Sequence, residues 1–163
     1  MTIAARLEVS NSVVLLREAQ RDDVAAIVDL LLDDPLGVRR ESADGDDGLR
    51  AYLDAFDAIK RDPAHLLLVV VDGSEVVATM QLSFIPGLAR RGALRAQIEG
   101  VRVRATHRGR GLGQALFGWA IEESRRRGCA LVQLSTDKSR AEARRFYERL
   151  GFIASHEGLK LDL

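Results

Sequence analysis

The sequence predicts one α/β (α+β) domain with a mixed, mostly antiparallel sheet of six to seven strands and about four flanking helices. Its 163 residues are enough for one well-buried core and too few to expect two. Strand-like and helix-like runs follow the order strand, two helices, three strands, helix, strand, helix and closing strands. A strong hairpin turn between two of the strands favours antiparallel pairing.

The first part of the chain is predicted to contain one strand and one helix. Residues 1–12 have no clear period and are expected to form a loosely held lead-in. The compact β-branched and apolar run at residues 13–17 predicts the first strand. Apolar residues at three-and-four spacing between residues 24 and 32, preceded by two acids, predict an amphipathic helix.

A second helix and a β-hairpin are expected next. Residues 39–48 are polar and acidic and predict a loop, followed by an amphipathic helix from about Asp47 to Lys60. Residues 65–71 are nearly continuously apolar, and the return strand is predicted at residues 75–85. Asp72-Gly73 between them is a favoured hairpin turn.

The fourth strand and third helix are predicted on either side of the glycine-rich turn. Residues 86–95 are expected to connect the third and fourth strands. In residues 97–104, apolar and polar side chains alternate imperfectly, which predicts the fourth strand. The lapse in alternation around Gly100 indicates a β-bulge. The helix at residues 112–127 is expected to stop at Gly128, with arginines at its negative end.

The last predicted elements are a strand, a short helix and a hairpin. The strand is expected at residues 130–134. Ser139 and Glu142 have the spacing of a capping box, which predicts a helix through Arg149. Residues 152–163 are expected to form a closing hairpin, so that the domain spans residues 13–163.

The net charge of the chain is zero but unevenly distributed. Residues 1–60 carry 13 acids and 7 bases, whereas residues 85–150 carry 15 bases and 6 acids. This asymmetry indicates a local anionic ligand near the glycine turn and no nucleic-acid-coating surface. A solvated arginine-rich helix face is the ordinary alternative explanation.

Cysteine content and hydropathy place the protein in the cytoplasm by default. Cys129 is the only cysteine, so no intramolecular disulfide and no cysteine-based metal cluster are expected. No apolar run approaches 18 residues, and no signal segment is present, so no membrane partner is expected. The three histidines are scattered singly, and no metal site is predicted.

The turn at residues 108–113 has the composition of an anion site. Glycines allow a sharp turn and a close approach of a ligand, and the first amides of the following helix are unpaired. A phosphate or pyrophosphate is the expected ligand. A Rossmann fingerprint does not fit, because Gln114 occupies the place of its third glycine.

Three motifs at fixed mutual spacing carry a resemblance to a known family. They are Ile98-Glu99 with Val101 and Val103, then Arg108 with Gly111 and Gly113, then Phe146-Tyr147 with Leu150-Gly151-Phe152. In these motifs, and in its order of elements, the chain resembles the GNAT superfamily of N-acetyltransferases. The resemblance covers about residues 13–163 and is strongest from Ile98 onward. It implies that the fourth and fifth predicted strands splay apart at the bulge.

The resemblance also implies acetyl-CoA as the co-substrate. Amides from Gly109 to Gly113 would hold its pyrophosphate, with Arg108 and Arg110 adding charge at the edge. The thioester would enter between Val101 and the end of the next strand. The expected cofactor-binding residues are Val101, Arg102, Val103, Arg108, Gly109, Arg110, Gly111, Leu112, Gly113, Gln114, Ser135, Arg140 and Phe146.

Amide formation by direct attack in a ternary complex needs a base for the amine and an acid for the leaving thiol. The resemblance assigns the acid to Tyr147, whose phenol stays protonated at neutral pH. Glu99 is the expected base, or it only orients the substrate. Many relatives carry an asparagine where this chain has Arg140, which either contacts the cofactor or leaves that contact unmade. Cys129 is expected to be a small core residue and not a nucleophile.

The acceptor is expected to be the primary amine of a small molecule. In the family, the acceptor site involves two loops, here residues 39–48 and 86–95. Acids in the first favour a cationic amine, whereas the arginines of the second favour a carboxylate- or phosphonate-bearing amine. The C-terminal part also resembles aminoalkylphosphonate acetyltransferases, which favours the anionic amine. A protein N-terminal or lysine acetyltransferase, or a non-catalytic CoA-binding regulator, remains an alternative. A homodimer is expected.

Overall fold

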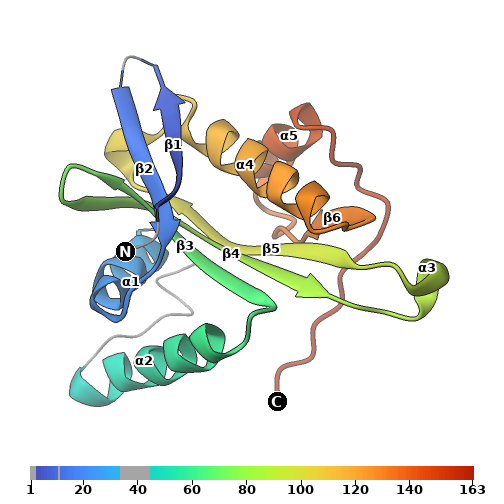
Figure 1. Cartoon of the computed structure of the whole chain (residues 1–163), viewed down its shortest axis with the longest axis horizontal. Coiled ribbons are helices and arrows are strands. Elements are labelled where there is room, and N and C mark those ends of the chain that lie inside the picture. The colour runs from blue at the N-terminus through green and yellow to red at the C-terminus, as the bar shows by residue number, and fades with distance from the viewer. Residues whose placement is uncertain (1–2, 11, 34–44) are drawn as a thin grey trace.

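Six strands form one mixed sheet in the order in which they occur along the chain (Figure 1). The computed structural model describes residues 3–10, 12–33 and 45–163. Neighbouring strands are antiparallel except for the last two, which are parallel and joined by a helical crossover. The described strands are β1 (Ile3–Val9), β2 (Ser12–Glu18), β3 (His65–Asp72), β4 (Glu75–Ile85), β5 (Arg95–Val103) and β6 (Leu131–Leu134).

Helices cover both faces of this sheet, with α1 and α2 on one face and α4 and α5 on the other (Figure 1). No helix in the described ranges combines the length and apolar character needed to cross a membrane. The described α-helices are α1 (Val24–Leu32), α2 (Gly45–Arg61), α3 (Ala89–Gly92), α4 (Leu112–Arg126) and α5 (Ala141–Arg149). Two 3₁₀ turns, η1 (Arg21–Asp23) and η2 (Ala105–His107), precede α1 and α4.

Strand β3 is apolar throughout because it faces a core on each side. Leu68 packs with Phe117 of α4 in the larger core, and the side chains of both are almost fully buried. Val69, the next residue, packs with Leu30 of α1 and Phe56 of α2 in the second core. A strand buried on both faces reads as a continuous apolar run instead of an alternating one.

The predicted α/β class and the predicted elements between residues 13 and 149 are confirmed, with small shifts at their ends. The helix expected at residues 22–32 forms as η1 followed by α1. The strand expected at residues 75–85 is β4, and the Asp72-Gly73 turn joins it to β3 as expected. These elements combine strong periodicity with clear turn signals.

The predicted bulge lies at Gly100. The β4–β5 register places Thr79 opposite Arg102 and Gln81 opposite Glu99, so β5 has one more residue than β4 across this interval. Gly100 has φ of 60°, a left-handed conformation that glycine adopts at little cost. The extra residue changes which side chains of β5 face each side of the sheet.

Strands β5 and β6 part close to this bulge. Their pairing runs from Arg95 opposite Leu131 to Ile98 opposite Leu134 and then ends. The remainder of β5, Glu99 to Val103, pairs with β4 only. The expected splay is therefore present between β5 and β6, which are the fourth and fifth strands of the sequence prediction.

The lead-in expected for residues 1–12 is wrong for most of its length, because Ile3–Val9 form the edge strand β1. Leu7 and Val9 are buried, whereas Arg6 and Glu8, which alternate with them, are exposed. This alternation is a half-buried strand signal that can be read in the sequence. Whether the domain begins at residue 13 stays a prediction.

The closing hairpin expected at residues 152–163 is also wrong. No strand follows Leu134 in the described chain, and every residue from Ile153 to the C-terminus is exposed. Leu159 and Leu161 are 94% and 85% exposed. A strand needs a neighbouring ladder for its backbone groups, and this tail lies along none.

The capping box expected at Ser139 and Glu142 is wrong, although the helix that it predicted exists. The Ser139 hydroxyl donates to Asp137 Oδ1 at 2.7 Å, and its amide donates to the same oxygen at 3.0 Å. The helix begins at Ala141, with Arg140 as its N-cap residue and without a side-chain cap. Ser139 therefore bonds to Asp137 in a local turn, and its hydroxyl does not cap the helix.

A nearly buried ion pair fixes the start of α1 against β2. Arg17 donates to both carboxylate oxygens of Asp23, at 2.6 and 2.8 Å, and the two side chains are 11% and 10% exposed. The Gln20 amide donates to the same carboxylate at 2.7 Å. Burial raises the pKa of Asp23, but these hydrogen bonds and the Arg17 charge outweigh it and lower the pKa below its ordinary value.

We expect Asp23→Ala to lower the free energy of unfolding by about 3–5 kcal/mol, because the Arg17 charge is left buried and unpaired. Urea unfolding at neutral pH measures the loss. Because the folded-state pKa of Asp23 lies below its unfolded value, its contribution is present above the unfolded pKa, about 4, and is lost as pH falls. The difference between wild type and variant should therefore shrink in acid.

Asp57→Ala is the matched control. Asp57 pairs with Arg21 at 2.6 Å, but the two side chains are 47% and 52% exposed. An exposed pair contributes about 1 kcal/mol or less. Equal losses of unfolding free energy in the two variants would show that burial does not increase the contribution of the Arg17–Asp23 pair to stability.

Candidate active site

The turn between β5 and α4 is open on one side. Gly109 and Gly111 have φ of 74° and 86°, and a Cβ added to either would meet no atom within 4 Å. Leu112, the first residue of α4, is buried in the larger core and anchors the turn. The two glycines thus present bare backbone to the space beside the helix N-terminus.

The backbone amides of this turn have no acceptor in the described chain. The Arg108 amide donates to Ala105 O and the Ala115 amide donates to Gly111 O, but the amides of residues 109–114 make no such bond. Amides at a helix N-terminus that lack an acceptor, together with the helix dipole, favour a bound anion. The turn therefore fits the pyrophosphate expected from the sequence.

Arg108 braces the turn. Its Nε donates to Val103 O at 2.8 Å, and its Nη2 lies 3.1 Å from Asp33 O and 2.9 Å from Asp33 Oδ2. These bonds tie the turn to the end of β5 and to the end of α1. The guanidinium of Arg110 makes no hydrogen bond or ion pair with the described residues, although its carbonyl accepts one from Ser10.

Gly113 serves the packing of two helices. A Cβ at this position would lie 3.4 Å from Cζ of Phe146 in α5. The absence of a side chain lets the first turn of α4 approach α5 closely. Gly113 therefore differs from Gly109 and Gly111, which face open space.

Tyr147 of α5 lies in an aromatic cluster beside the splayed strands. Its ring centroid is 5.4 Å from that of Phe117, 5.6 Å from that of Phe146 and 6.2 Å from that of Phe152. Burial raises the pKa of Tyr147, while the charges of Arg140 and Arg102 lower it in part. The net direction is upward, so the phenol holds its proton at neutral pH.

The contacts bring most of the sequence-predicted site residues to one region. Arg108 joins the turn to β5, Gly113 joins α4 to α5, and the Arg102 charge acts on Tyr147 across the gap between β5 and α5. The gathered elements also contribute Val101 and Val103 of β5, both half-buried against the larger core, Gln114 on the first turn of α4 and the exposed Ser135 after β6.

Glu99 lies on the opposite face of the sheet from the α4 core. It is exposed, stands opposite Gln81 and immediately precedes the bulge. Arg102, after the bulge, stands opposite Thr79. Thr79 and Gln81 alternate along β4, so Glu99 and Arg102 share one face.

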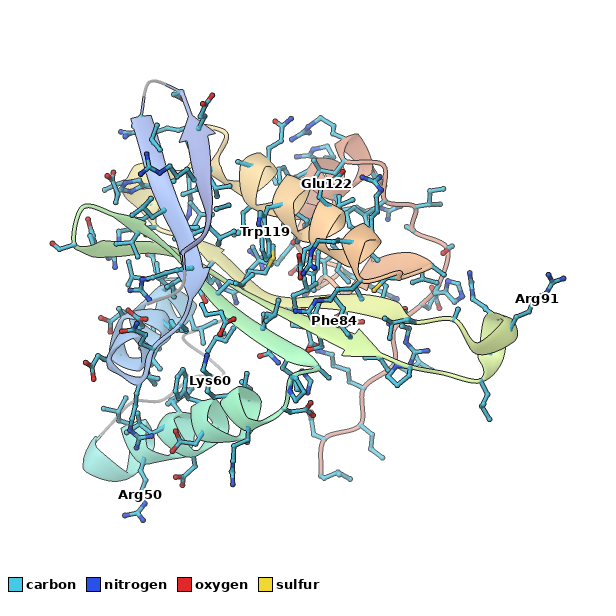
Figure 2. All side chains as sticks on the ribbon, viewed as in Figure 1. Arg50, Lys60, Phe84, Arg91, Trp119 and Glu122 are labelled. Carbon is cyan, nitrogen blue, oxygen red and sulfur yellow. The ribbon has the colours of Figure 1, made fainter. Side chains whose placement is uncertain are left out.

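Of the two acceptor loops expected from the sequence, only the second can be placed in the described structure. Residues 34–44, most of the first loop, lie outside the described residues. Arg90 and Arg91 form a left-handed turn at the tip of the β4–β5 hairpin, and Arg91 points away from the body (Figure 2). Of that loop's arginines, only Arg95 belongs to the sheet itself.

A row of polar residues across the sheet was missed by the sequence analysis. His65, Ser83, Gln97 and Gln133 stand opposite one another on β3, β4, β5 and β6. Ser83 Oγ lies 2.8 Å from His65 Nδ1, and Gln133 Nε2 donates to Gln97 Oε1 at 2.7 Å. Polar residues at alternate positions of apolar strands are the signal in the sequence, but only the strand registers align them.

Cys129 is unsuited to be a nucleophile. Its side chain is half-buried against the larger core, and burial raises the pKa of its thiol, with Arg127 opposing this in part. The reactive thiolate is therefore scarce at neutral pH. Among the described residues, no group of three or more His, Cys, Asp or Glu could hold a metal ion.

Comparison with known proteins gives a consistent result. Residues 24–152 match the model of the acetyltransferase (GNAT) family. The chain is 36% identical to aminoalkylphosphonate N-acetyltransferase of Salmonella typhimurium over 108 residues, 66% of this chain and 69% of that protein. It is 40% identical to glucosamine 6-phosphate N-acetyltransferase of Trypanosoma brucei brucei over 89 residues, 54% of this chain and 58% of that protein.

A solved structure covers more of the chain. A protein of Bacillus halodurans C-125, described as a transcriptional regulator, superposes with a TM-score of 0.88 at 47% identity. The match covers 92% of this chain and 99% of that one. The fold seen here is therefore shared almost from end to end.

We expect Gly111→Ala to weaken CoA binding roughly tenfold, measured by isothermal titration calorimetry. An alanine at φ of 86° is strained by roughly 1–2 kcal/mol, and its methyl group enters the space above the free amides. Gly118→Ala is the control, since Gly118 lies within α4, exposed and with no atom near its added Cβ. If Gly111→Ala binds CoA as tightly as Gly118→Ala does, the turn is not the pyrophosphate site.

Proposed function

We propose, because the chain belongs to the acetyltransferase (GNAT) family, that it moves an acetyl group from acetyl-CoA to the primary amine of a small molecule. Membership makes it an acyltransferase enzyme, and the family uses acetyl-CoA. One observation carries the proposal for this chain. A turn of free amides at the start of α4 lies next to parted strands and a protonated tyrosine.

The residues present fit acetyl-CoA. The free amides of residues 109–114 would hold its pyrophosphate, and the edge of β5 beyond Ile98, which lacks a partner on the β6 side, would receive its extended arm. Arg110 would add charge, while Arg108 would hold the turn in shape. When bound, the thioester supplies an activated acetyl group for attack by the amine.

We assign the acid to Tyr147 and the base to Glu99. Tyr147 keeps its proton at neutral pH because burial raises its pKa, so it can give that proton to the departing thiol. Glu99 is exposed on the other face of the sheet, where a protonated amine would be attracted and could lose a proton directly or through water. Acid and base on opposite sides of the parted strands suit direct attack in one ternary complex.

An amine that carries an anionic group is the acceptor class that we favour. Two relatives are named for acceptors with a phosphorus oxyanion, an aminoalkylphosphonate and glucosamine 6-phosphate. The matches cover little more than half to two thirds of each protein, so the acceptor does not transfer directly to this chain. We also propose a cytoplasmic location, since the reaction uses metabolites of that compartment.

A regulatory, non-catalytic role is the second candidate. The observation in its favour is the Bacillus halodurans protein described as a transcriptional regulator, which shares the fold at 47% identity. CoA binding without thiol release for any amine, including an N-terminal or lysine peptide, would support this role. Thiol release with a peptide alone would support a protein acetyltransferase.

We expect Tyr147→Phe to lower the acetylation rate at least about tenfold while leaving acetyl-CoA affinity nearly unchanged, because only the phenol proton is removed from a packed ring. Thiol release measures the rate, and calorimetry measures affinity. Phe152→Leu is a control for packing, since Phe152 touches Tyr147 in the same cluster. Equal rates for wild type and Tyr147→Phe would remove Tyr147 from the mechanism.

We further propose a homodimer that uses the C-terminal tail, residues 152–163. Leu159, Leu161 and Leu163 alternate with Lys160 and Asp162, which is a strand pattern with one apolar face, and all three leucines are exposed. Within the described sheet, strand β6 lies at the edge and pairs with β5 alone. A tail strand added to the β6 edge of a second copy would bury leucines that one chain leaves in water.

We expect a chain ending at Gly158 to sediment as a monomer, with the full chain a dimer, in analytical ultracentrifugation at equal concentration. The charged variant Lys160→Glu is the control, because Lys160 lies on the other side of the strand pattern and should leave the dimer intact. A dimer that survives truncation would place the contact elsewhere.

A further inference from the structure

The polar row, defined as His65, Ser83, Gln97 and Gln133, lies on the face of the sheet that α1 and α2 cover in part. On the same face, β3 contributes Leu67, Val69 and Val71 to the core under α1 and α2. On β3 the row begins at His65, the next position on this face after Leu67. Polar groups gain little from apolar packing and need hydrogen-bond partners when they are buried. A row of uncharged polar groups on neighbouring strands therefore favours the binding of a polar ligand.

The row has hydrogen-bonding capacity to spare. A glutamine amide offers two donors and one acceptor oxygen with two lone pairs. In the described structure, Gln97 uses only its oxygen, which accepts from Gln133, and Gln133 uses only its nitrogen. The donors of Gln97 and the oxygen of Gln133 thus remain open, next to each other and half-buried. Hydroxyl groups, which both donate and accept, match this pair.

Charges of opposite sign stand on either side of Gln97 along β5. Glu99, Gln97 and Arg95 occupy alternate positions before the bulge and therefore share one face. Arg95 has a buried Nε without a hydrogen-bond partner in the described chain. Its Nη1 would lie 3.7 Å from a Cβ at Gly87, so the guanidinium rests against the start of the hairpin loop. A guanidinium that is partly buried and unpaired is costly unless an anion completes it.

We propose that this face binds a hydroxylated primary amine with an anionic group at its far end. The amine lies at Glu99, the hydroxyls contact Gln97 and Gln133, and the anion pairs with Arg95. His65 and Ser83 hold the β3 and β4 side of the row through their mutual hydrogen bond. This assignment rests on the proposed function, because it names the acceptor of the same transferase site.

The spacing along β5 distinguishes acceptor classes. Glu99 and Arg95 are four residues apart, about 13 Å along an extended strand. The side chains of Glu99 and Arg95 can each reach toward the ligand and shorten this distance. A ligand whose amine and anion are separated by only two carbons is still too short to contact Glu99, Gln97 and Arg95 at once. A polyamine would place a second positive charge near Arg95, which is unfavourable. An amino sugar phosphate has the required order of amine, hydroxyls and anion.

The test measures acetyl-CoA thiol release with three amines: glucosamine 6-phosphate, glucosamine and 2-aminoethylphosphonate. We expect the highest kcat/KM for glucosamine 6-phosphate. Arg95→Met should raise KM for glucosamine 6-phosphate roughly tenfold or more, with little change in kcat and little change for glucosamine. Gln97→Leu should raise KM for both sugars, because both carry the hydroxyls.

Arg91→Met is the matched control, since Arg91 lies on the same hairpin but points away from the body (Figure 2). It should leave all three amines unaffected. CoA affinity, measured on each variant, verifies that the fold and the donor site are intact. Calorimetric binding of glucosamine 6-phosphate to the CoA-bound protein gives a second readout that does not need turnover, and Arg95→Met should weaken it by the same factor.

The outcomes separate the two levels of the proposal. Turnover that prefers 2-aminoethylphosphonate, or an unchanged KM for glucosamine 6-phosphate in Arg95→Met, overturns the acceptor assignment and leaves the transferase intact. Tight CoA binding without thiol release from any amine overturns the transferase itself. In that case, weaker binding of glucosamine 6-phosphate to Arg95→Met than to wild type would still support the polar row as its site.

Discussion

The extra residue at Gly100 is the constraint on which the rest of the site depends. Two residues of β5 stand against one of β4 at this point, and only glycine takes the left-handed φ of 60° at little cost. The alternation of β5 changes there, so Val101 and Val103 turn to the core under α4 while Glu99 and Arg102 share the other face. Immediately beforehand β5 loses contact with β6. One local irregularity thus separates the proposed donor side from the proposed acceptor side, at the point where β5 and β6 part.

The uneven distribution of charged residues along the chain has local consequences in the folded protein. Part of the basic second half of the chain is neutralised in the fold, since Arg108 pairs with Asp33, Arg104 with Glu75, and Arg126 with Glu123. Among the described residues, the groups that a bound anion could still contact include the free amides at the start of α4, the Arg110 guanidinium and the Nε of Arg95. The ion pairs support the solvated-arginine interpretation of the charge asymmetry, whereas the local anion stays a prediction at the remaining groups.

The shared fold constrains function less than these local features do. A protein described as a transcriptional regulator and two named N-acetyltransferases all resemble this chain. A sheet with helices on both faces can support many activities. The free amides, the protonated Tyr147 and the exposed Glu99 are what favour turnover here, because each has a physical property that acetyl transfer needs.

Local signals were sufficient for most elements, including the glycine turn that we propose as the donor side of the site. The glycine turn, the bulge and the tyrosine helix are contiguous segments whose conformations follow from glycine φ preferences and side-chain periodicity. The edge strand β1 was also readable, from the alternation of Leu7 and Val9 with charged residues. The C-terminal hairpin was predicted from an equally good alternation and did not form, because a strand exists only where another strand offers it a ladder.

The polar row, which we propose as the acceptor side, depended on tertiary structure. His65, Ser83, Gln97 and Gln133 are separated by up to dozens of residues, and only the registers of four strands place them in one row. Likewise, Arg90 and Arg91 look equivalent to Arg95 along the chain, yet the hairpin carries Arg91 into solvent and leaves Arg95 in the sheet. By itself, the sequence determined most of the elements, the bulge and the glycine turn, since these arise from neighbouring residues. The tertiary structure decided which distant side chains share a face, because strand pairing sets that relation.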